Sequence, residues 1–187
     1  PALPKKKLTA MSKLAMGHVI RVTFSFSERF WDGMSFAGKT LSNMSFLLSR
    51  DEWFPTWWTR APEKSPVITA WAPFPSADRL SGKSESFVVD KSLETLSRLL
   101  GVSKLGAHLN AAYVHDWQSD PWSRGAYSYV KVGGDRAEQD LGAPLNGALF
   151  FAGEATDIVG NNGTVNGAIA SGKRVAKEIT ASSGHGT

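Results

Sequence analysis

The sequence contains no cysteine among its 187 residues. Disulfide bonds, thiolate metal ligands, cysteine nucleophiles and a cofactor linked through sulfur are therefore excluded for this stretch of chain. No apolar run approaches the roughly 20 residues that a membrane-spanning helix needs. The motifs G-x-S-x-G, Walker A and H-E-x-x-H are also absent, which removes the most readily recognised signatures of hydrolases and nucleotide-binding loops.

The excess of positive charge is confined to the first part of the chain. The net charge is +4, yet residues 1–29 hold six Lys or Arg against one Glu, so the remainder is slightly acidic. This distribution predicts a basic first helix with a solvated face, and no nucleic-acid partner is expected. A non-catalytic module that binds an acidic partner through the Lys5–Lys7 run and exposed aromatic residues is kept as an alternative.

The chain begins at Pro1 rather than Met, and it has neither the apolar region nor the cleavage site of a signal peptide. We expect an internal or C-terminal piece of a longer protein. Such a piece does not define a compartment by itself; a soluble, cytoplasmic location is expected ahead of secretion.

Hydrophobic periodicity predicts helices and strands along the whole chain. Apolar Ile20, Val22 and Phe24 alternate with polar neighbours, as in a half-buried strand, and helical spacing follows the capping residue Ser84 up to Gly101. Helices are predicted over 4–16, 84–100 and 164–180, and strands over 18–26, 44–48, 67–71, 108–117, 126–130 and 149–151. The region 133–147 is rich in Gly, Pro and charge and is predicted to be a connection.

One candidate site follows the predicted strand 149–151. Gly153 and the carboxylate of Glu154 come directly after the strand, and Gly163 and Thr164 open the last helix. Ligands of α/β sheets bind at the carboxyl ends of strands, and the N–H groups at a helix start suit an electron-rich group. On spacing alone, a strand–loop–helix joint with a capping glutamate is the favoured interpretation.

A second candidate site is aromatic. Trp117, Trp122, Tyr127 and Tyr129 lie within thirteen residues of a turn-prone segment. Aromatic faces can sandwich a flat cofactor or hold a cation, while packing beneath a loop is an equal alternative.

Other conspicuous side chains carry weaker signals. Arg21 lies on the polar face of the strand 18–26, where the pattern alone favours a solvated arginine. Trp57 and Trp58 are predicted to pack in the core and at an edge. The four histidines show no metal-ligand spacing, so no metal site is predicted.

Taken together, these segments resemble the flavin-containing amine oxidase family: monoamine oxidases, polyamine oxidases, L-amino-acid oxidases and flavin histone demethylases. The motifs that carry the resemblance are GHVIRV at 17–22 with Phe30-Trp31, DPWSRGAYSYV at 120–130, and LFFAGEAT followed by GTVNGAIASGKRVA within 149–176. The resemblance spans nearly the whole chain and is to the C-terminal part of the family.

The resemblance implies an α+β fold: a mixed β-sheet substrate domain with flanking helices, plus the last strand and helix of a Rossmann-type FAD domain. Residues 1–140 are expected to form the later part of the substrate-binding domain. Residues 141–187 are expected to form the C-terminal strand, loop and helix of the FAD-binding domain.

Matching positions imply roles for particular residues. Arg21 stands where many members place a flavin-proximal lysine, and Arg21 and Thr164 are the implied catalytic positions. Tyr127 and Thr164 lie where the substrate cage is built. The implied cofactor-binding residues are Trp117, Trp122, Gly153, Glu154, Gly163, Thr164 and Val165.

The implied reaction oxidises a C–N bond of a small-molecule amine or amino acid by hydride transfer to FAD, with oxygen reduced to hydrogen peroxide. The absence of cysteine implies noncovalent FAD. The family's N-terminal G-x-G-x-x-G is absent from these residues, so the chain by itself is expected to be inactive without that FAD-binding segment. A desaturase-like or porphyrinogen oxidase-like member of the same superfamily is the alternative within enzymes.

Overall fold

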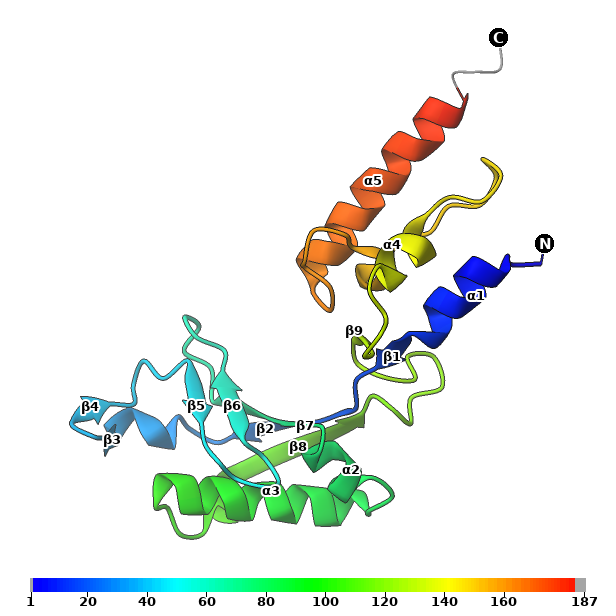
Figure 1. Ribbon diagram of the computed structural model, residues 1–187. Helices are drawn as coiled ribbons and strands as arrows, with labels where there is room; N and C mark the ends of the chain where they lie inside the picture. Colours follow the sequence, from blue (N-terminus) through cyan, green and yellow to red (C-terminus); the bar gives the residue numbers. More distant parts are fainter. Residues whose placement is uncertain (1, 184–187) are drawn as a thin grey trace. The chain divides into compact units, whose positions relative to one another are not determined.

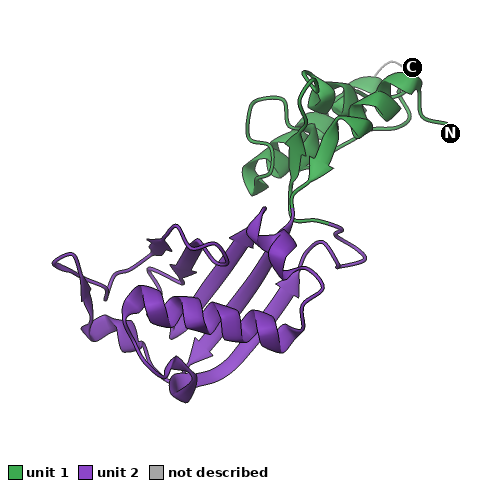
Figure 2. Cartoon of the chain, turned by 60° about the horizontal axis from the view of Figure 1, so that its bottom comes forward, with its two compact units in different colours: residues 1–17, 125–187 green, residues 18–124 purple. Residues whose placement is uncertain are grey.

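The computed structural model describes residues 2–183 of the chain. The chain divides into two compact units (Figure 2). The sheet unit comprises residues 18–124, and the terminal unit joins the start of the chain, up to residue 17, to the part from residue 125 onward. Each unit is described by itself.

The sheet unit is built on five antiparallel strands in the order β5-β6-β7-β2-β8. Helix α3 lies across one face of this sheet (Figure 2). The strands are β2 (Val19–Phe26), β5 (Phe46–Leu48), β6 (Thr56–Thr59), β7 (Val67–Pro73) and β8 (Leu109–Asp116). The remaining elements are η1 (Phe30–Gly33), β3 (Ser35–Phe36), β4 (Lys39–Thr40), α2 (Ser76–Leu80), α3 (Glu85–Leu100) and η2 (Leu105–His108).

Alternation along β2 separates the two faces of the sheet. Ile20, Val22, Phe24 and Phe26 are buried in the core beneath α3, whereas Arg21, between Ile20 and Val22, is exposed on the opposite face. Because cross-strand neighbours share a face, Arg21 has Trp71 of β7 on one side and His115 of β8 on the other. This uncovered face of the sheet therefore carries polar and aromatic side chains.

The two ends of helix α3 are determined by capping residues. The Ser84 hydroxyl accepts a hydrogen bond from the backbone N–H of Phe87 at 3.2 Å, and the helix ends at Gly101 with a φ of 67°. Only glycine adopts this left-handed conformation without strain. The predicted helix over 84–100 is confirmed.

The terminal unit consists of three helices and a short two-stranded sheet (Figure 1). Strands β1 and β9 pair antiparallel, with Ala15 opposite Tyr129. Its elements are α1 (Lys5–Ser12), β1 (Leu14–Met16), β9 (Ser128–Val130), α4 (Ala137–Gly142), η3 (Glu154–Thr156) and α5 (Val165–Ser183). No helix in the described part of the chain is long and apolar enough to cross a membrane.

Several predicted boundaries were wrong. The first helix ends at Ser12 rather than near residue 16, because Leu14–Met16 pair with β9 instead. The region 133–147 contains the short helix α4. Residues 149–151 form no strand, since an isolated bridge between Leu145 and Leu149 is their only pairing with described residues.

The combination of helix and sheet is confirmed. Every strand pair among residues 2–183 is antiparallel, whereas a mixed sheet was expected. The two units meet at residues 17–18 and 124–125. The assignment of 1–140 to a substrate domain and 141–187 to an FAD domain stays a prediction.

Candidate functional site

Glu154 connects three segments of the terminal unit. Its carboxylate accepts hydrogen bonds from the backbone N–H of Ser128 at 2.9 Å, from the Ser128 hydroxyl at 2.8 Å and from the N–H of Gly163 at 2.6 Å. A carboxylate has about four lone-pair sites. Three are used within the chain, so Glu154 fixes the loop before α5 and retains limited capacity for a ligand.

The start of α5 presents free backbone donors. Thr164 caps the helix, because its hydroxyl accepts from the N–H of Gly167 at 3.1 Å and donates to the carbonyl of Asn161 at 2.6 Å. The N–H groups of Val165 and Asn166 have no acceptor among residues 2–183. Together with the positive end of the helix dipole, they favour an electron-rich group at this point.

Tyr127 lies close to this loop. A Cβ atom at Gly17 would stand 3.0 Å from Cε2 of its ring, and a Cβ at Gly163 would stand 3.6 Å from its Cβ. Burial raises the pKa of the Tyr127 phenol, so it stays neutral over the physiological range. Glycine at position 17 therefore lets the backbone approach the tyrosine closely, whereas at Gly163 the φ of 70° is the reason for glycine.

In the sheet unit, Arg21 and Trp117 are in contact. The guanidinium of Arg21 lies 5.7 Å from the centroid of the Trp117 ring, within the range of a cation–π contact. The ring of His115 meets Trp117 edge-on, with centroids 4.2 Å apart. Two of the predicted residues are thus brought together, and His115 joins them.

Trp122 differs from Trp117, since its side chain is 93% exposed. Asp120 fixes the surrounding turn by accepting hydrogen bonds from the N–H of Trp122 at 2.8 Å and of Ser123 at 3.0 Å. These backbone hydrogen bonds hold the pKa of Asp120 below its usual range. The turn therefore presents a large aromatic surface for which the sheet unit supplies no packing partner.

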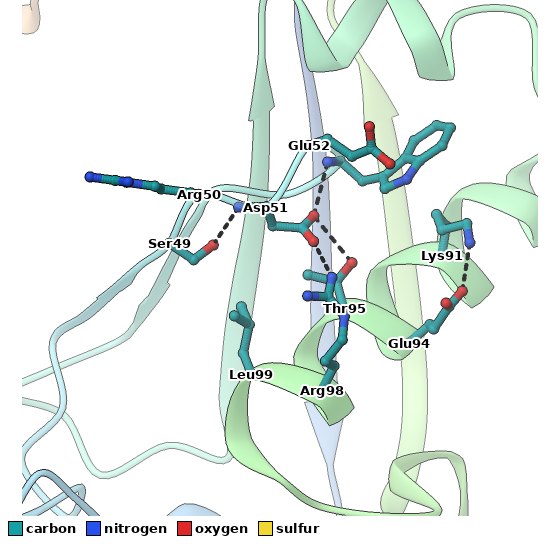
Figure 3. Close-up of a pocket in the computed structure, with 10 residues that line it drawn as sticks. Ser49, Arg50, Asp51, Glu52, Lys91, Glu94, Thr95, Arg98 and Leu99 are labelled. Atoms are coloured by element: carbon teal, nitrogen blue, oxygen red, sulfur yellow. Dashed lines mark hydrogen bonds and ion pairs between the residues drawn. The ribbon is translucent and has the colours of Figure 1, made fainter.

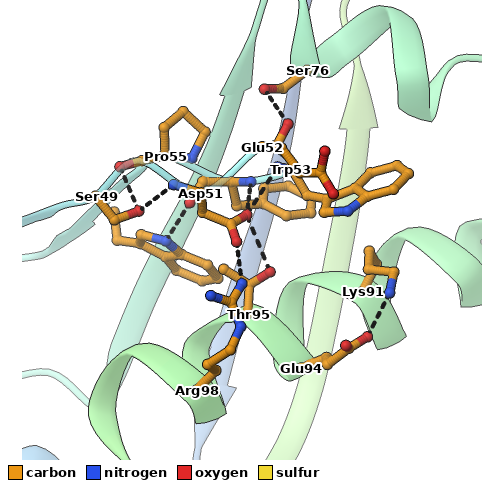
Figure 4. Close-up of polar contacts among 12 residues, drawn as sticks. Ser49, Asp51, Glu52, Trp53, Pro55, Ser76, Lys91, Glu94, Thr95 and Arg98 are labelled. Atoms are coloured by element: carbon orange, nitrogen blue, oxygen red, sulfur yellow. Dashed lines mark hydrogen bonds and ion pairs between the residues drawn. The ribbon is translucent and has the colours of Figure 1, made fainter.

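A separate cavity of about 620 Å³ opens beside α3 (Figure 3). At its centre Asp51 accepts from the N–H groups of Trp53 and Phe54 at 2.9 and 2.8 Å, and it contacts Thr95 and Arg98 of α3 (Figure 4). Arg50 points away from this cluster (Figure 3). The carboxylate is satisfied by the chain itself, so Asp51 ties the loop after β5 to α3.

Comparison with known proteins shows the family. A model of the flavin containing amine oxidoreductases matches residues 1–180. The chain belongs to this family. Among curated relatives, the chain is 35% identical over 181 residues to "Lysine-specific histone demethylase 1 homolog 3" of Arabidopsis thaliana, covering 96% of this chain and 11% of that protein. It is 29% identical to "Lysine-specific histone demethylase 2" of Homo sapiens, covering 97% of this chain and 22% of that protein.

Among solved structures, a double mutant of putrescine oxidase superimposes with a TM-score of 0.79 at 25% identity. The alignment covers 97% of this chain and 39% of that one. The chain thus spans about a tenth to a quarter of the curated relatives named above and about two fifths of that structure.

The residues present fit a flavin. In the terminal unit, the free N–H groups at the start of α5 suit the electron-rich edge of such a ring, and the Glu154 carboxylate suits hydroxyl donors. In the sheet unit, taken by itself, the exposed Trp122 offers a flat apolar face. Family membership implies FAD as the cofactor. No cluster of three or more potential metal ligands occurs within the described residues.

Sequence reasoning missed Ser128, His115 and Asp120. Ser128 supplies two of the three donors to Glu154 but lies 26 residues away in sequence, so spacing could not reveal it. His115 was missed because its place opposite Arg21 depends on the register of β2 and β8, which local spacing does not fix. Glu154, Thr164 and Tyr127 lie in the terminal unit, and Arg21, Trp117 and Trp122 lie in the sheet unit.

Proposed function

We propose that this chain is part of an enzyme that oxidises a C–N bond of an amine or amino acid. The family match over residues 1–180 is the observation that carries the proposal. Bound FAD would accept a hydride from the carbon next to nitrogen, the resulting imine would be hydrolysed by water, and oxygen would take up the two electrons as hydrogen peroxide. FAD is held noncovalently, consistent with the absence of cysteine from this sequence.

The residues of the terminal unit bind and orient the cofactor. The N–H groups of Val165 and Asn166 would stabilise negative charge on a flavin at the start of α5. Glu154 holds the loop that carries Gly163, and its carboxylate would accept a hydrogen bond from a hydroxyl of FAD. Tyr127, neutral because burial raises its pKa, supplies a wall that favours a desolvated, uncharged amine. Thr164 acts beside it as the cap of the helix.

The sheet unit, taken by itself, also offers side chains for the cofactor of the full-length protein. Trp117 and Trp122 would pack beside a flavin ring, and Arg21, in contact with Trp117, would supply a fixed positive charge. Unlike lysine, arginine stays protonated and forms a planar fork of donors. Arg21 therefore acts through its charge and its stacking on Trp117, and not as a base.

A second candidate substrate is favoured by the relatives' names. Two named relatives are lysine-specific histone demethylases, at 35% and 29% identity. A methylated lysine side chain also carries a C–N bond next to hydrogen-bearing carbon. A methylated histone peptide therefore belongs in the substrate test beside small amines and amino acids.

The experiment is peroxide release by the full-length protein over a panel of monoamines, diamines, amino acids and a methyl-lysine histone peptide. Under anaerobic conditions the same substrate should bleach the visible absorbance of bound flavin. Peroxide formed in proportion to the carbonyl product is expected. Flavin that is bound but reduced by no amine, or reoxidised without peroxide, would instead favour the desaturase-like or porphyrinogen oxidase-like alternative.

A further inference from the structure

The side chain of Trp117 is held by neighbours from two strands. Its backbone N–H donates to the carbonyl of Val19 at 3.1 Å, which fixes the main chain at the end of β8. The indole itself is contacted by the guanidinium of Arg21 and by the ring of His115. Because His115 and Arg21 face each other across β8 and β2, the two contacts come from one rigid part of the sheet.

His115 also faces a carboxylate. Its Nε2 atom is buried and lies 3.4 Å from Oδ2 of Asp120, while no described residue accepts a formed hydrogen bond from it. The distance is long for an N–H···O bond. An ionised carboxylate only accepts, so the contact is attractive when Nε2 carries a proton. The two backbone hydrogen bonds to its other oxygen keep Asp120 ionised at neutral pH.

The burial of the His115 Nε2 atom determines whether its contact with Asp120 contributes to the structure. A solvated histidine with a distant carboxylate would contribute little. A buried polar nitrogen, however, has lost its water and is stabilised only by a partner within the protein. Asp120 is the charged group placed to be that partner, and it also fixes the turn that carries Trp122. His115 therefore links the Trp117 ring to the Trp122 turn.

We propose that His115 is a positioning residue that, through Trp117 and Asp120, holds both tryptophans in place for the flavin. This inference rests on the proposed function, since the flavin gives the two rings their role. Hydrogen bonds of this kind are often long before a ligand is bound and tighten in the complex.

Two variants of the full-length protein separate the two contacts of His115. His115→Phe keeps a flat ring against Trp117 and removes the donor to Asp120. His115→Gln keeps a terminal N–H for Asp120 and removes the ring. The matched control is His108→Phe, because His108 also faces a carboxylate and an aromatic ring, those of Glu28 and Phe30, at the other end of β8.

The readout besides activity is ¹⁹F NMR of protein labelled with 5-fluorotryptophan, with signals assigned through Trp117→Phe and Trp122→Phe. His115→Phe should shift the Trp122 signal, and His115→Gln should shift the Trp117 signal. Each variant should lower kcat on the order of tenfold with KM changed less than about twofold, because misplaced groups slow the reaction more than they weaken binding. The control should change neither the two signals nor kcat.

The outcomes distinguish the two proposals. A flavin-bound protein in which both His115 variants leave the two signals and kcat unchanged would overturn the positioning role and leave the proposed function standing. A wild-type full-length protein that holds no flavin would overturn the proposed function, and the positioning role with it. Equal signal changes in His108→Phe would show general unfolding of the sheet unit and would also overturn the assignment to His115.

Discussion

Lys7 is the residue that departs most from its sequence pattern. It belongs to a run of three lysines, yet it is 4% exposed. Its ammonium group donates to the carbonyls of Asp140, Leu141 and Ala143 at 3.2, 2.6 and 2.5 Å, and it lies 3.8 Å from the centre of the Phe151 ring. The last carbonyls of a helix lack partners within it, so Lys7 caps α4. The prediction that this run forms a solvated face was wrong for Lys7.

Replacing Lys7 should therefore loosen the terminal unit. Lys7→Met leaves three partly buried carbonyls without their donor, and we expect a loss of about 2 kcal/mol in local stability. Amide hydrogen exchange of α1 and α4 measures it, since all seven tryptophans lie in the sheet unit and fluorescence would not report the change. Lys5→Met, at an exposed position of the same helix, is the control. Equal protection in both variants would show that Lys7 is not a cap.

Asp51 predicts a pH dependence of the sheet unit. Burial alone would raise its pKa, but hydrogen bonds from Phe54 and Trp53 and the contact with Arg98 outweigh burial and hold that pKa below the ordinary value of 3.8. As pH falls, the unfolded chain takes up this proton first. The stability that Asp51 contributes is thus present at neutral pH and lost as pH falls through 3.8 toward the folded-state pKa.

Asp51→Asn should cost about 2 kcal/mol at about pH 7 and clearly less at about pH 3. Urea unfolding followed by tryptophan fluorescence measures both values. Glu52→Gln is the matched control, because the neighbouring carboxylate is exposed and only its backbone carbonyl accepts hydrogen bonds. A loss that is the same at both pH values would contradict the role of the ionised carboxylate.

At the scale of elements, helix α5 contains two glycines, of which one leaves no room for a Cβ atom and the other does. A Cβ at Gly167 would lie 2.2 Å from the carbonyl oxygen of Asn161, whereas a Cβ at Gly172 would meet nothing within 4 Å. Helix propensity favours alanine at either position by about 0.5–1 kcal/mol. Overpacking against a backbone atom costs about 1–3 kcal/mol, so at Gly167 the clash wins.

Gly167→Ala should therefore destabilise α5 in this chain, and Gly172→Ala should stabilise it by about 0.5–1 kcal/mol. Urea unfolding followed by far-ultraviolet circular dichroism, with hydrogen exchange to locate the change in α5, measures both. Each variant is the control for the other, since the substitution and the helix are the same. A Gly167→Ala protein as stable as the wild type would show that the loop at Asn161 yields without cost.

The sequence predicts those helices and strands whose signals are local, and it misses those that depend on distant partners. Helix α3 was predictable because its apolar spacing, its Ser84 cap and its Gly101 end are all local. The strand expected at 149–151 has the right residues, but a strand needs a neighbour to pair with, and none of the described residues supplies a ladder. Strand β6 was missed because Trp57 and Trp58, two large residues in succession, face opposite sides of the sheet, one buried and one half-buried.

In the candidate site, too, only the residues that lie close together in sequence were predictable. The residues Glu154, Gly163 and Thr164 lie close in sequence, and their spacing pointed to one loop. Their partners Ser128 and Tyr127 come from a distant segment, which only the fold brings near. Positions that act through contacts across strands, as His115 does with Arg21, require the register of the sheet, and local spacing does not fix register.

At the scale of the whole molecule, the chain matches 39% of the putrescine oxidase chain that it resembles. The terminal unit leaves Val165 75% and Ile169 53% exposed on α5, and residues 149–151 are unpaired beyond one bridge. No G-x-G-x-x-G occurs in the sequence, so its residues supply no glycine-rich cradle for the diphosphate of FAD.

We therefore expect the 187-residue chain to lose FAD, and the full-length protein to keep it. Each protein is incubated with excess FAD and passed through gel filtration, and the visible absorbance of flavin is measured in the protein peak. Without contacts to the diphosphate, the binding free energy from the free N–H groups of α5 is too small to offset the translational and rotational entropy that FAD loses on binding. Retention of micromolar FAD by the short chain would contradict this expectation and would show that the α5 start and Glu154 suffice for binding.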